Sequence, residues 1–288
     1  MVRFSGTDNS DGIDIAAFGF KHNKYDDRVE FGAAFDYGFA ILSQPILESF
    51  KPAVLPSEGF KFVKGDVVEF MGYGKTDAES EIKNNRLYKG KGLLKSKDFP
   101  TTLTIEPHPD HPNQMVCNGD SGGPLYLRNI SGKPILMGVT SGSHPSERRD
   151  DAENCKGLTL FADVWEYLLW MNPMFDHENG SVQILEPGDI RKFSYVDIDF
   201  YGPRSYLMIP ALSGEFNLTI AYENEDWMGA VEILETEISQ AAATKVLNTA
   251  TSRTESYQLS LNGKPRLIVI RSSSNTAKVT VPKNLTKS

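Results

Sequence analysis

Cysteine, basic charge and long apolar runs are all scarce in this sequence. Only two of its 288 residues are cysteines, Cys117 and Cys155, and they lack the spacing of a zinc site, which normally uses four nearby ligands. They form either one disulfide or two free thiols. No apolar run, such as that at 167–171, approaches the ~20 residues that a membrane-spanning helix needs. We therefore expect neither a structural zinc nor a membrane span.

The charge balance excludes a further class of partner. The chain has 30 Lys and Arg residues against 38 Asp and Glu, which gives a formal net charge of −8. An acidic surface disfavours non-specific binding to phosphate backbones, so we expect no nucleic-acid partner. Residues 1–20 contain one Arg and no continuous apolar stretch, so they do not form a secretion signal.

The patterning that is present predicts an all-β protein. Hydrophobic residues make up 40% of the chain, with 24 Gly and 16 Pro, which excludes collagen, coiled coil and extensive disorder. Short alternating or β-branched segments are separated by Gly, Pro, Asn and Ser, as in sandwiches and barrels. These segments are 12–18, 36–42, 66–71, 134–140, 193–200, 218–222, 230–234, 256–261, 267–270 and 278–281.

One helix is expected, and a domain boundary follows it. The best helical stretch is 162–171, and Asn172-Pro173 stops it. Polar, turn-rich residues come next, and a new series of strand-like segments begins after Val182. We predict two domains, 1–176 and 181–288, the second being a β-sandwich with a hairpin signal at Asn262-Gly263.

The sharpest local signal is the sequence Cys-Asn-Gly-Asp-Ser-Gly-Gly-Pro at 117–124. Glycines on both sides of Ser121 let the backbone turn tightly and direct amide groups into one pocket, where they can hold an oxyanion. Ser121 would then be a nucleophile. The alternative is a glycine-rich turn with an ordinary serine.

With its preceding cysteine, this motif resembles the nucleophile motif of the chymotrypsin-like (trypsin-fold) serine peptidase family. The resemblance covers roughly residues 1–175 and implies a double β-barrel whose first barrel is incomplete. Other matches occur in family order. They are the aspartate strand at 36–42, a Gly-Tyr-Gly turn at 72–74, the cleft strand at 138–141, Cys155 as partner of Cys117, and residues 161–164 before the terminal helix.

The resemblance assigns roles to individual residues. Asp36 would accept a hydrogen bond from a histidine and hold the tautomer that deprotonates Ser121. Gly119 and Ser121 would donate the oxyanion-hole N–H groups. Asp120 would be the buried carboxylate that pairs with a new amino terminus after activation. A Cys117–Cys155 bridge implies an oxidising compartment, and so a secreted protein.

The family's catalytic histidine has no counterpart here, because it lies about 45 residues before the aspartate and that position falls before Met1. We expect that the chain starts partway through the first barrel and that it is inactive alone, since loss of a triad base costs on the order of a millionfold in turnover. His22 is not the base, because its setting resembles a surface loop of the family. His108 and His111 lie in a Pro-stiffened loop that we expect to face solvent, and His144 and His177 lie in polar loops.

Primary specificity can be predicted in part from the resemblance. Met115 occupies the base of the substrate pocket, where a tryptic enzyme has an aspartate, so a preference for Arg or Lys is disfavoured. Ser141, Ser143 and Thr159 would line its walls and narrow it, which favours small or medium apolar side chains. The charged segment 144–154 is a solvated loop or, alternatively, a gate for substrate.

Two functions remain open at this stage. The first is a serine endopeptidase that acts on protein or peptide substrates, needs no cofactor or metal, and is represented here by an incomplete chain. The second is a non-catalytic homologue used for binding or adhesion. In the second domain, Tyr201, Tyr206 and Trp227 are candidates for contact with a surface or glycan, but the expectation is that they pack in the core. The acidic turn at 223–226 is expected to be solvated rather than to bind Ca²⁺.

Overall fold

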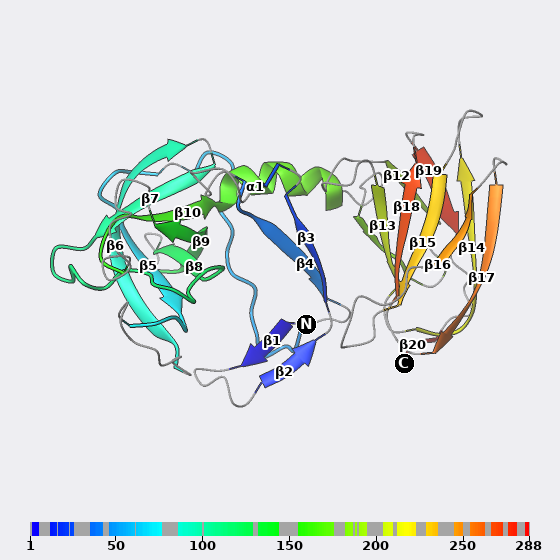
Figure 1. The fold of residues 1–288 in the computed structure, drawn as a ribbon, viewed down its shortest axis with the longest axis horizontal. Coiled ribbons are helices and arrows are strands. Elements are labelled where there is room, and N and C mark those ends of the chain that lie inside the picture. Colours follow the sequence, from blue (N-terminus) through cyan, green and yellow to red (C-terminus); the bar gives the residue numbers. More distant parts are fainter. Residues whose placement is uncertain are drawn as a thin grey trace.

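The structure is a computed structural model in which β-strands dominate and one α-helix is present among the described residues (Figure 1). It describes residues 2–5, 12–15, 17–22, 24–25, 35–42, 46–60, 62–76, 86–99, 101–128, 132–143, 155–175, 182–186, 188, 190–194, 204–209, 212–222, 229–235, 245–249, 254–262, 266–272, 276–280 and 286–287. The predictions for 144–154, His177, Tyr201, 223–226 and Trp227 lie outside these ranges.

The N-terminal strands form two small antiparallel sheets. Strand β1 (Val2–Ser5) pairs with β2 (Gly12–Ile15), and β3 (Ala17–Lys21) pairs with β4 (Gly38–Leu42). The single strand predicted at 12–18 is therefore wrong, because this segment is divided between two sheets with different partners. The β3–β4 pair leads directly from Asp36, since β4 begins two residues after it.

The middle of the chain closes into a six-stranded barrel. Its strands are hydrogen-bonded in the order β10-β7-β6-β5-β8-β9, so each edge is paired. A closed sheet holds the loops between its strands in fixed places, which matters because Ser121 lies in one of them. The strands are β5 (Val67–Gly72), β6 (Tyr88–Phe99), β7 (Thr102–Pro107), β8 (Pro124–Arg128), β9 (Pro134–Ser143) and β10 (Thr159–Asp163).

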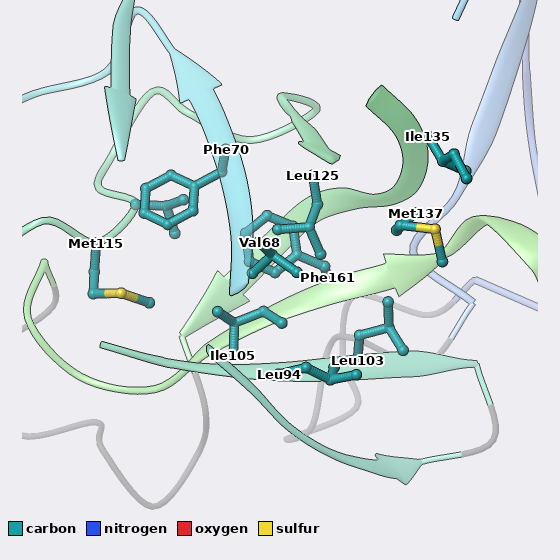
Figure 2. Packing of buried hydrophobic residues seen from close by; sticks show 11 residues of the cluster. Val68, Phe70, Leu94, Leu103, Ile105, Met115, Leu125, Ile135, Met137 and Phe161 are labelled. Carbon is teal, nitrogen blue, oxygen red and sulfur yellow. The ribbon is translucent and has the colours of Figure 1, made fainter. Parts of the chain in front are cut away.

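Apolar side chains from all six strands fill the barrel, and Figure 2 shows them converging on one another. Leu103, Ile105, Leu125 and Phe161 are at most 1% exposed. Complete burial of one such side chain stabilises a fold by about 1.5–3 kcal/mol, so this cluster is the main support of the barrel. Its members are Val68, Phe70, Leu94, Leu103, Ile105, Met115, Val116, Leu125, Ile135, Met137 and Phe161.

Helix α1 (Val164–Met171) follows β10 without a loop. It starts two residues later than the predicted 162, because Ala162 still belongs to β10. The buried Asp163 is the N-cap and accepts a 3.0 Å hydrogen bond from the Trp165 N–H. Lys97 of β6 lies 2.9 Å from Asp163, which ties this helix end to the barrel. The predicted stop is confirmed: a 3₁₀ turn, Asn172–Phe175, begins at Asn172.

The described C-terminal strands form two five-stranded sheets. One has the order β11-β13-β18-β15-β16, and the other has the order β12-β19-β14-β17 with β20 paired to β14. Whether they pack as the predicted sandwich stays a prediction. No helix in the described ranges is long and apolar enough to span a membrane. The strands are β11 (Val182–Ile184), β12 (Ile190–Ser194), β13 (Arg204–Ile209), β14 (Leu212–Tyr222), β15 (Gly229–Glu235), β16 (Lys245–Thr249), β17 (Thr254–Asn262), β18 (Arg266–Ser272), β19 (Thr276–Thr280) and β20 (Thr286–Lys287).

Candidate active site

Ser121 is exposed on a tight turn that only glycines allow. Gly119 has φ = +100° and Gly122 has φ = +83°, in the left-handed region that side chains disfavour. Within the turn the Asp120 N–H donates to the Cys117 carbonyl at 3.0 Å, and the Gly123 N–H donates to the Asp120 carbonyl at 2.8 Å. The serine side chain is therefore presented outward by a rigid backbone.

This turn is fastened to strand β9 at Thr140. The Gly122 N–H donates to the Thr140 carbonyl at 2.9 Å, and the Thr140 N–H donates to the Gly123 carbonyl at 2.8 Å. The Thr140 hydroxyl adds a third bond to the same Gly123 carbonyl, at 3.0 Å. These bonds hold the two residues that follow Ser121 against Thr140.

Asp36 reaches the next residue of the same strand. The Ser141 hydroxyl donates a 2.6 Å hydrogen bond to Asp36 Oδ2, and both residues are half-buried. Because Gly122 is bonded to Thr140 and Asp36 to Ser141, the structure brings the serine turn and the carboxylate to consecutive residues of β9. This bond to Ser141, a residue expected only in the pocket wall, was not predicted from the sequence.

The Asp120 carboxylate is held by main-chain donors. Its Oδ1 accepts the Gly74 N–H and its Oδ2 accepts the Cys117 N–H, both at 2.8 Å. A Cβ placed on Gly72 would lie 1.8 Å from Asp120 Oδ1, and one on Gly74 would lie 2.6 Å from it. Both ends of the Gly-Tyr-Gly turn are therefore glycine because this carboxylate occupies the space of a side chain.

Cys117 and Cys155 form a disulfide, as the family resemblance implied. Both cysteines are buried, at 9% and 4% exposure. The bond joins the start of the serine turn to the segment before β10, and the two residues are 38 positions apart in the sequence. It is a second fastening of the turn, independent of the hydrogen bonds to β9.

His22 is buried, although Lys21 and Lys24 beside it are exposed, as the resemblance to a surface loop implied. Only 6% of the residue is exposed, and its ring lies between those of Phe35 and Trp170, at 4.8 and 4.5 Å. Its Nδ1 accepts the Lys24 N–H at 3.1 Å. Burial, together with the Lys24 charge, lowers the pKa of His22 from 6.5 to about 4. The ring is therefore neutral at physiological pH and is enclosed by aromatic residues.

The other described histidines form a local pair. His108 and His111 face each other at 5.7 Å between ring centroids, and the Asp110 N–H donates to His108 Nδ1 at 3.2 Å. Both residues are half-buried rather than open to solvent, which corrects the expectation for this loop. In the part of the chain that the structure describes, no three His, Cys, Asp or Glu residues form a group that could hold a metal.

The residues expected to line the substrate pocket lie on three segments. Thr159 of β10 is directly opposite Ser143 of β9, so these two are neighbours across the sheet. Thr159 is buried, and Met115 belongs to the barrel core. Their roles in binding substrate stay predictions.

A cavity of about 220 Å³, with Asp120 as one of its lining residues, was not predicted from the sequence. Its walls come from β5, β6 and two loops, so no single stretch of sequence marks it. The residues that line it include Phe70, Gly72, Gly74, Lys75, Lys89, Met115 and Asp120.

Comparisons with known proteins identify what this chain is similar to. The family model described as Trypsin matches residues 4–171. Glucanase inhibitor protein 1 of Phytophthora sojae is 29% identical over 145 residues, which are 48% of this chain and 53% of that protein. The chain thus spans about half the length of this curated relative. Among solved structures, neuropsin, a serine protease expressed in the limbic system of mouse brain, matches at 18% identity with a TM-score of 0.49, over 60% of this chain and 78% of its own.

Proposed function

Because this chain belongs to the trypsin family, we propose that it is a serine-type endopeptidase chain in which Ser121 is the nucleophile and Asp36 orients the general base. The observation that carries the proposal is that the turn containing Ser121 and the Asp36 carboxylate are bonded to consecutive residues of β9, Thr140 and Ser141. Two segments 85 positions apart meet at one strand, and nucleophilic catalysis with an oriented base requires such an approach.

In the proposed reaction, Ser121 Oγ attacks the carbonyl carbon of a peptide bond and its proton passes to an imidazole. The oxygen that becomes negative accepts hydrogen bonds from the N–H groups of Gly119 and Ser121, a contribution worth roughly 10²–10³ in rate per donor. The imidazole then gives its proton to the leaving amine, and water hydrolyses the acyl-serine. Asp36 would hold the imidazole in the tautomer that accepts the serine proton.

The imidazole is the part that the described residues do not supply. His22 is enclosed by Phe35 and Trp170, and His108 pairs with His111. The family places this histidine before the aspartate in the sequence. The proposal therefore requires that the reactive form of the protein contains such a residue, and that the 288-residue chain reacts poorly without it.

Substrate, location and domain organisation follow from the same family context. A methionine at 115 instead of an acidic residue, with Thr159 opposite Ser143, supports a pocket for small or medium apolar side chains. The disulfide supports secretion, since such bonds persist in oxidising compartments. We propose that 1–176 form the peptidase-type domain and 181–288 a β-sandwich accessory domain.

A second function is favoured by one relative. Glucanase inhibitor protein 1 carries the name of an inhibitor, although it is similar to this chain over about half its length. If this chain has a similar role, it is a non-catalytic homologue whose cleft binds another protein. The serine turn would then have a structural role only.

Labelling with a fluorophosphonate probe separates the two functions. The protein isolated from its natural source is treated with probe, and the modified peptide is identified by mass spectrometry. The peptidase proposal expects a stoichiometric adduct on Ser121 that is absent in Ser121→Ala and at least tenfold slower in Asp36→Asn. If Ser121 stays unlabelled in correctly folded protein, and the protein cleaves no member of a peptide library, the result contradicts the peptidase proposal and favours the non-catalytic homologue.

A further inference from the structure

Asp36 lies between two aromatic residues, and the one that follows it contacts helix α1 directly. The ring of Tyr37 stacks on that of Tyr167 with centroids 4.1 Å apart and planes within 5° of parallel. Tyr167 is 1% exposed, and burial raises its pKa to about 12. Burial also raises the pKa of Tyr37, which is half-buried, so both rings are neutral across the physiological range.

The residue before Asp36 reaches the same helix through a histidine. The Phe35 ring stacks on His22 at 4.8 Å, and His22 lies 4.5 Å from Trp170. His22 also meets the Tyr167 ring edge-on at 5.8 Å. Since residues three apart share a helix face, Tyr167 and Trp170 present one aromatic surface to both neighbours of Asp36.

The backbone at Phe35 is held in a conformation that it would not adopt alone. Phe35 is the one described residue other than glycine with positive φ, at +60°, a conformation that is strained for a bulky residue. The Tyr37 N–H donates to the Phe35 carbonyl, and the His22 N–H donates to the Tyr37 carbonyl, both at 2.9 Å. These hydrogen bonds and the ring stacks together hold the backbone on both sides of Asp36 in this conformation.

We propose that Tyr167 and Trp170 of helix α1 are positioning residues for Asp36, acting through Tyr37 on one side and through His22 and Phe35 on the other. The inference rests on the proposed function insofar as Asp36 orients a catalytic imidazole. Neither helix residue touches reacting atoms. They set where the carboxylate lies relative to the Ser141 hydroxyl and to the serine turn.

Helix α1 is a suitable reference because its first turn is fixed to the barrel. Asp163, which is fully buried, caps it and contacts Lys97, and Glu166 lies 2.5 Å from the same Lys97 ammonium. Because the helix is fixed to the barrel, its contacts with Tyr37 and His22 fix Asp36 relative to the barrel. Catalytic groups need to be held within about 0.5 Å, and a misplacement of about 1 Å can cost a hundredfold in rate.

The first test measures the NMR chemical shift of the Asp36 carboxylate and requires no catalytic activity. The full chain is labelled with ¹³Cγ-aspartate, and the Asp36 resonance is assigned with Asp36→Asn. We expect Tyr167→Leu to shift this resonance and Tyr167→Phe, which keeps the stack, to leave it in place. Leu168→Ala is the matched control, since Leu168 is a buried residue of the same helix outside the aromatic contacts. Equal shifts in Leu168→Ala and Tyr167→Leu, or no shift in either, would overturn the inference.

The second test uses the form of the protein that contains the general-base histidine and measures the rate of Ser121 labelling per folded molecule, well below the unfolding temperature. Positioning predicts a loss of at least tenfold in Tyr167→Leu and less than twofold in Leu168→Ala. Where Tyr167→Leu does not fold, Tyr37→Leu removes the same stack from its other partner. Absence of labelling in the unmodified form that contains the general-base histidine refutes the proposed function alone, because the resonance of Asp36 is measured independently. A tenfold loss in both helix variants, or in neither, refutes the positioning role.

Discussion

The hydroxyl of Ser141 donates a 2.6 Å hydrogen bond to Asp36, a residue 105 positions earlier in the chain. The bond joins the segment before β4 to the strand that also holds the serine turn. It is charge-assisted and half-buried, so it contributes more than an ordinary surface contact. It is therefore the contact between the N-terminal strands and the barrel on which the site depends most directly.

Replacing Ser141 by Ala is expected to lower the free energy of unfolding by about 1–3 kcal/mol, because a half-buried carboxylate loses a donor. Urea denaturation measures the loss. Ser143→Ala, two residues further along β9, is the control and is expected to cost much less. Equal costs for the two variants would show that the bond to Asp36 contributes nothing of its own.

Gly72→Ala is expected to displace the Asp120 carboxylate, since the new Cβ would lie 1.8 Å from its Oδ1. The N–H groups of Gly74 and Cys117 then lose their acceptor, at a cost of about 2–4 kcal/mol. In the double variant Gly72→Ala, Asp120→Ala the methyl group fills the vacated space. The loss of unfolding free energy in the double variant should therefore be smaller, by about 1 kcal/mol or more, than the sum of the losses in the two single variants. Thermal or urea unfolding measures the three losses, and simple additivity would contradict the contact.

Acid is expected to destabilise the protein through His22 between pH 6.5 and about 4. The folded-state pKa of about 4 lies below the ordinary value of 6.5, so in this range the unfolded chain binds the additional proton. The stability contributed by neutral His22 is complete above pH 6.5 and is lost as the pH falls toward 4, up to about 3 kcal/mol. Urea midpoints measured across this range test the expectation. His22→Phe should flatten the slope, and an unchanged slope in that variant would assign it to other groups.

Removal of the disulfide by Cys117→Ala and Cys155→Ala is expected to lower stability by roughly 4 kcal/mol, the chain-entropy figure for a loop of 38 residues. Chemical denaturation of the two proteins gives the difference. A reducing agent should destabilise the parent protein by a similar amount and leave the double variant unchanged. Sensitivity of the double variant to reductant would reject this explanation.

Local signals predicted part of the fold well. The helix stop at Asn172-Pro173 follows from proline chemistry, and the alternating segment 134–140 lies within β9. Strand β6 was missed because its sequence, Tyr-Lys-Gly-Lys-Gly-Leu-Leu-Lys-Ser-Lys-Asp-Phe, is rich in Gly and Lys. Its extended form depends on pairing with β5 and β7, a tertiary effect that overrides local propensity.

The candidate site also has a part that local sequence predicted and a part that it did not. The turn around Ser121 was recognisable because glycines, serine and cysteine are contiguous in the sequence. The Asp36–Ser141 bond was not, since it depends on the path of the chain between them. The burial of His22 was not predicted, because its neighbours in sequence are polar, whereas the Trp170 ring that lies against it belongs to a distant helix.

The Cys117–Cys155 bond also governs how the protein responds to a protease. A single cut anywhere between these two residues leaves the pieces covalently joined, with Ser121 still attached to the barrel on one side of the break. Electrophoresis without a thiol would show an undivided chain, and only reduction would separate the fragments. A nicked molecule could thus go unnoticed in any preparation that is not reduced before it is sized.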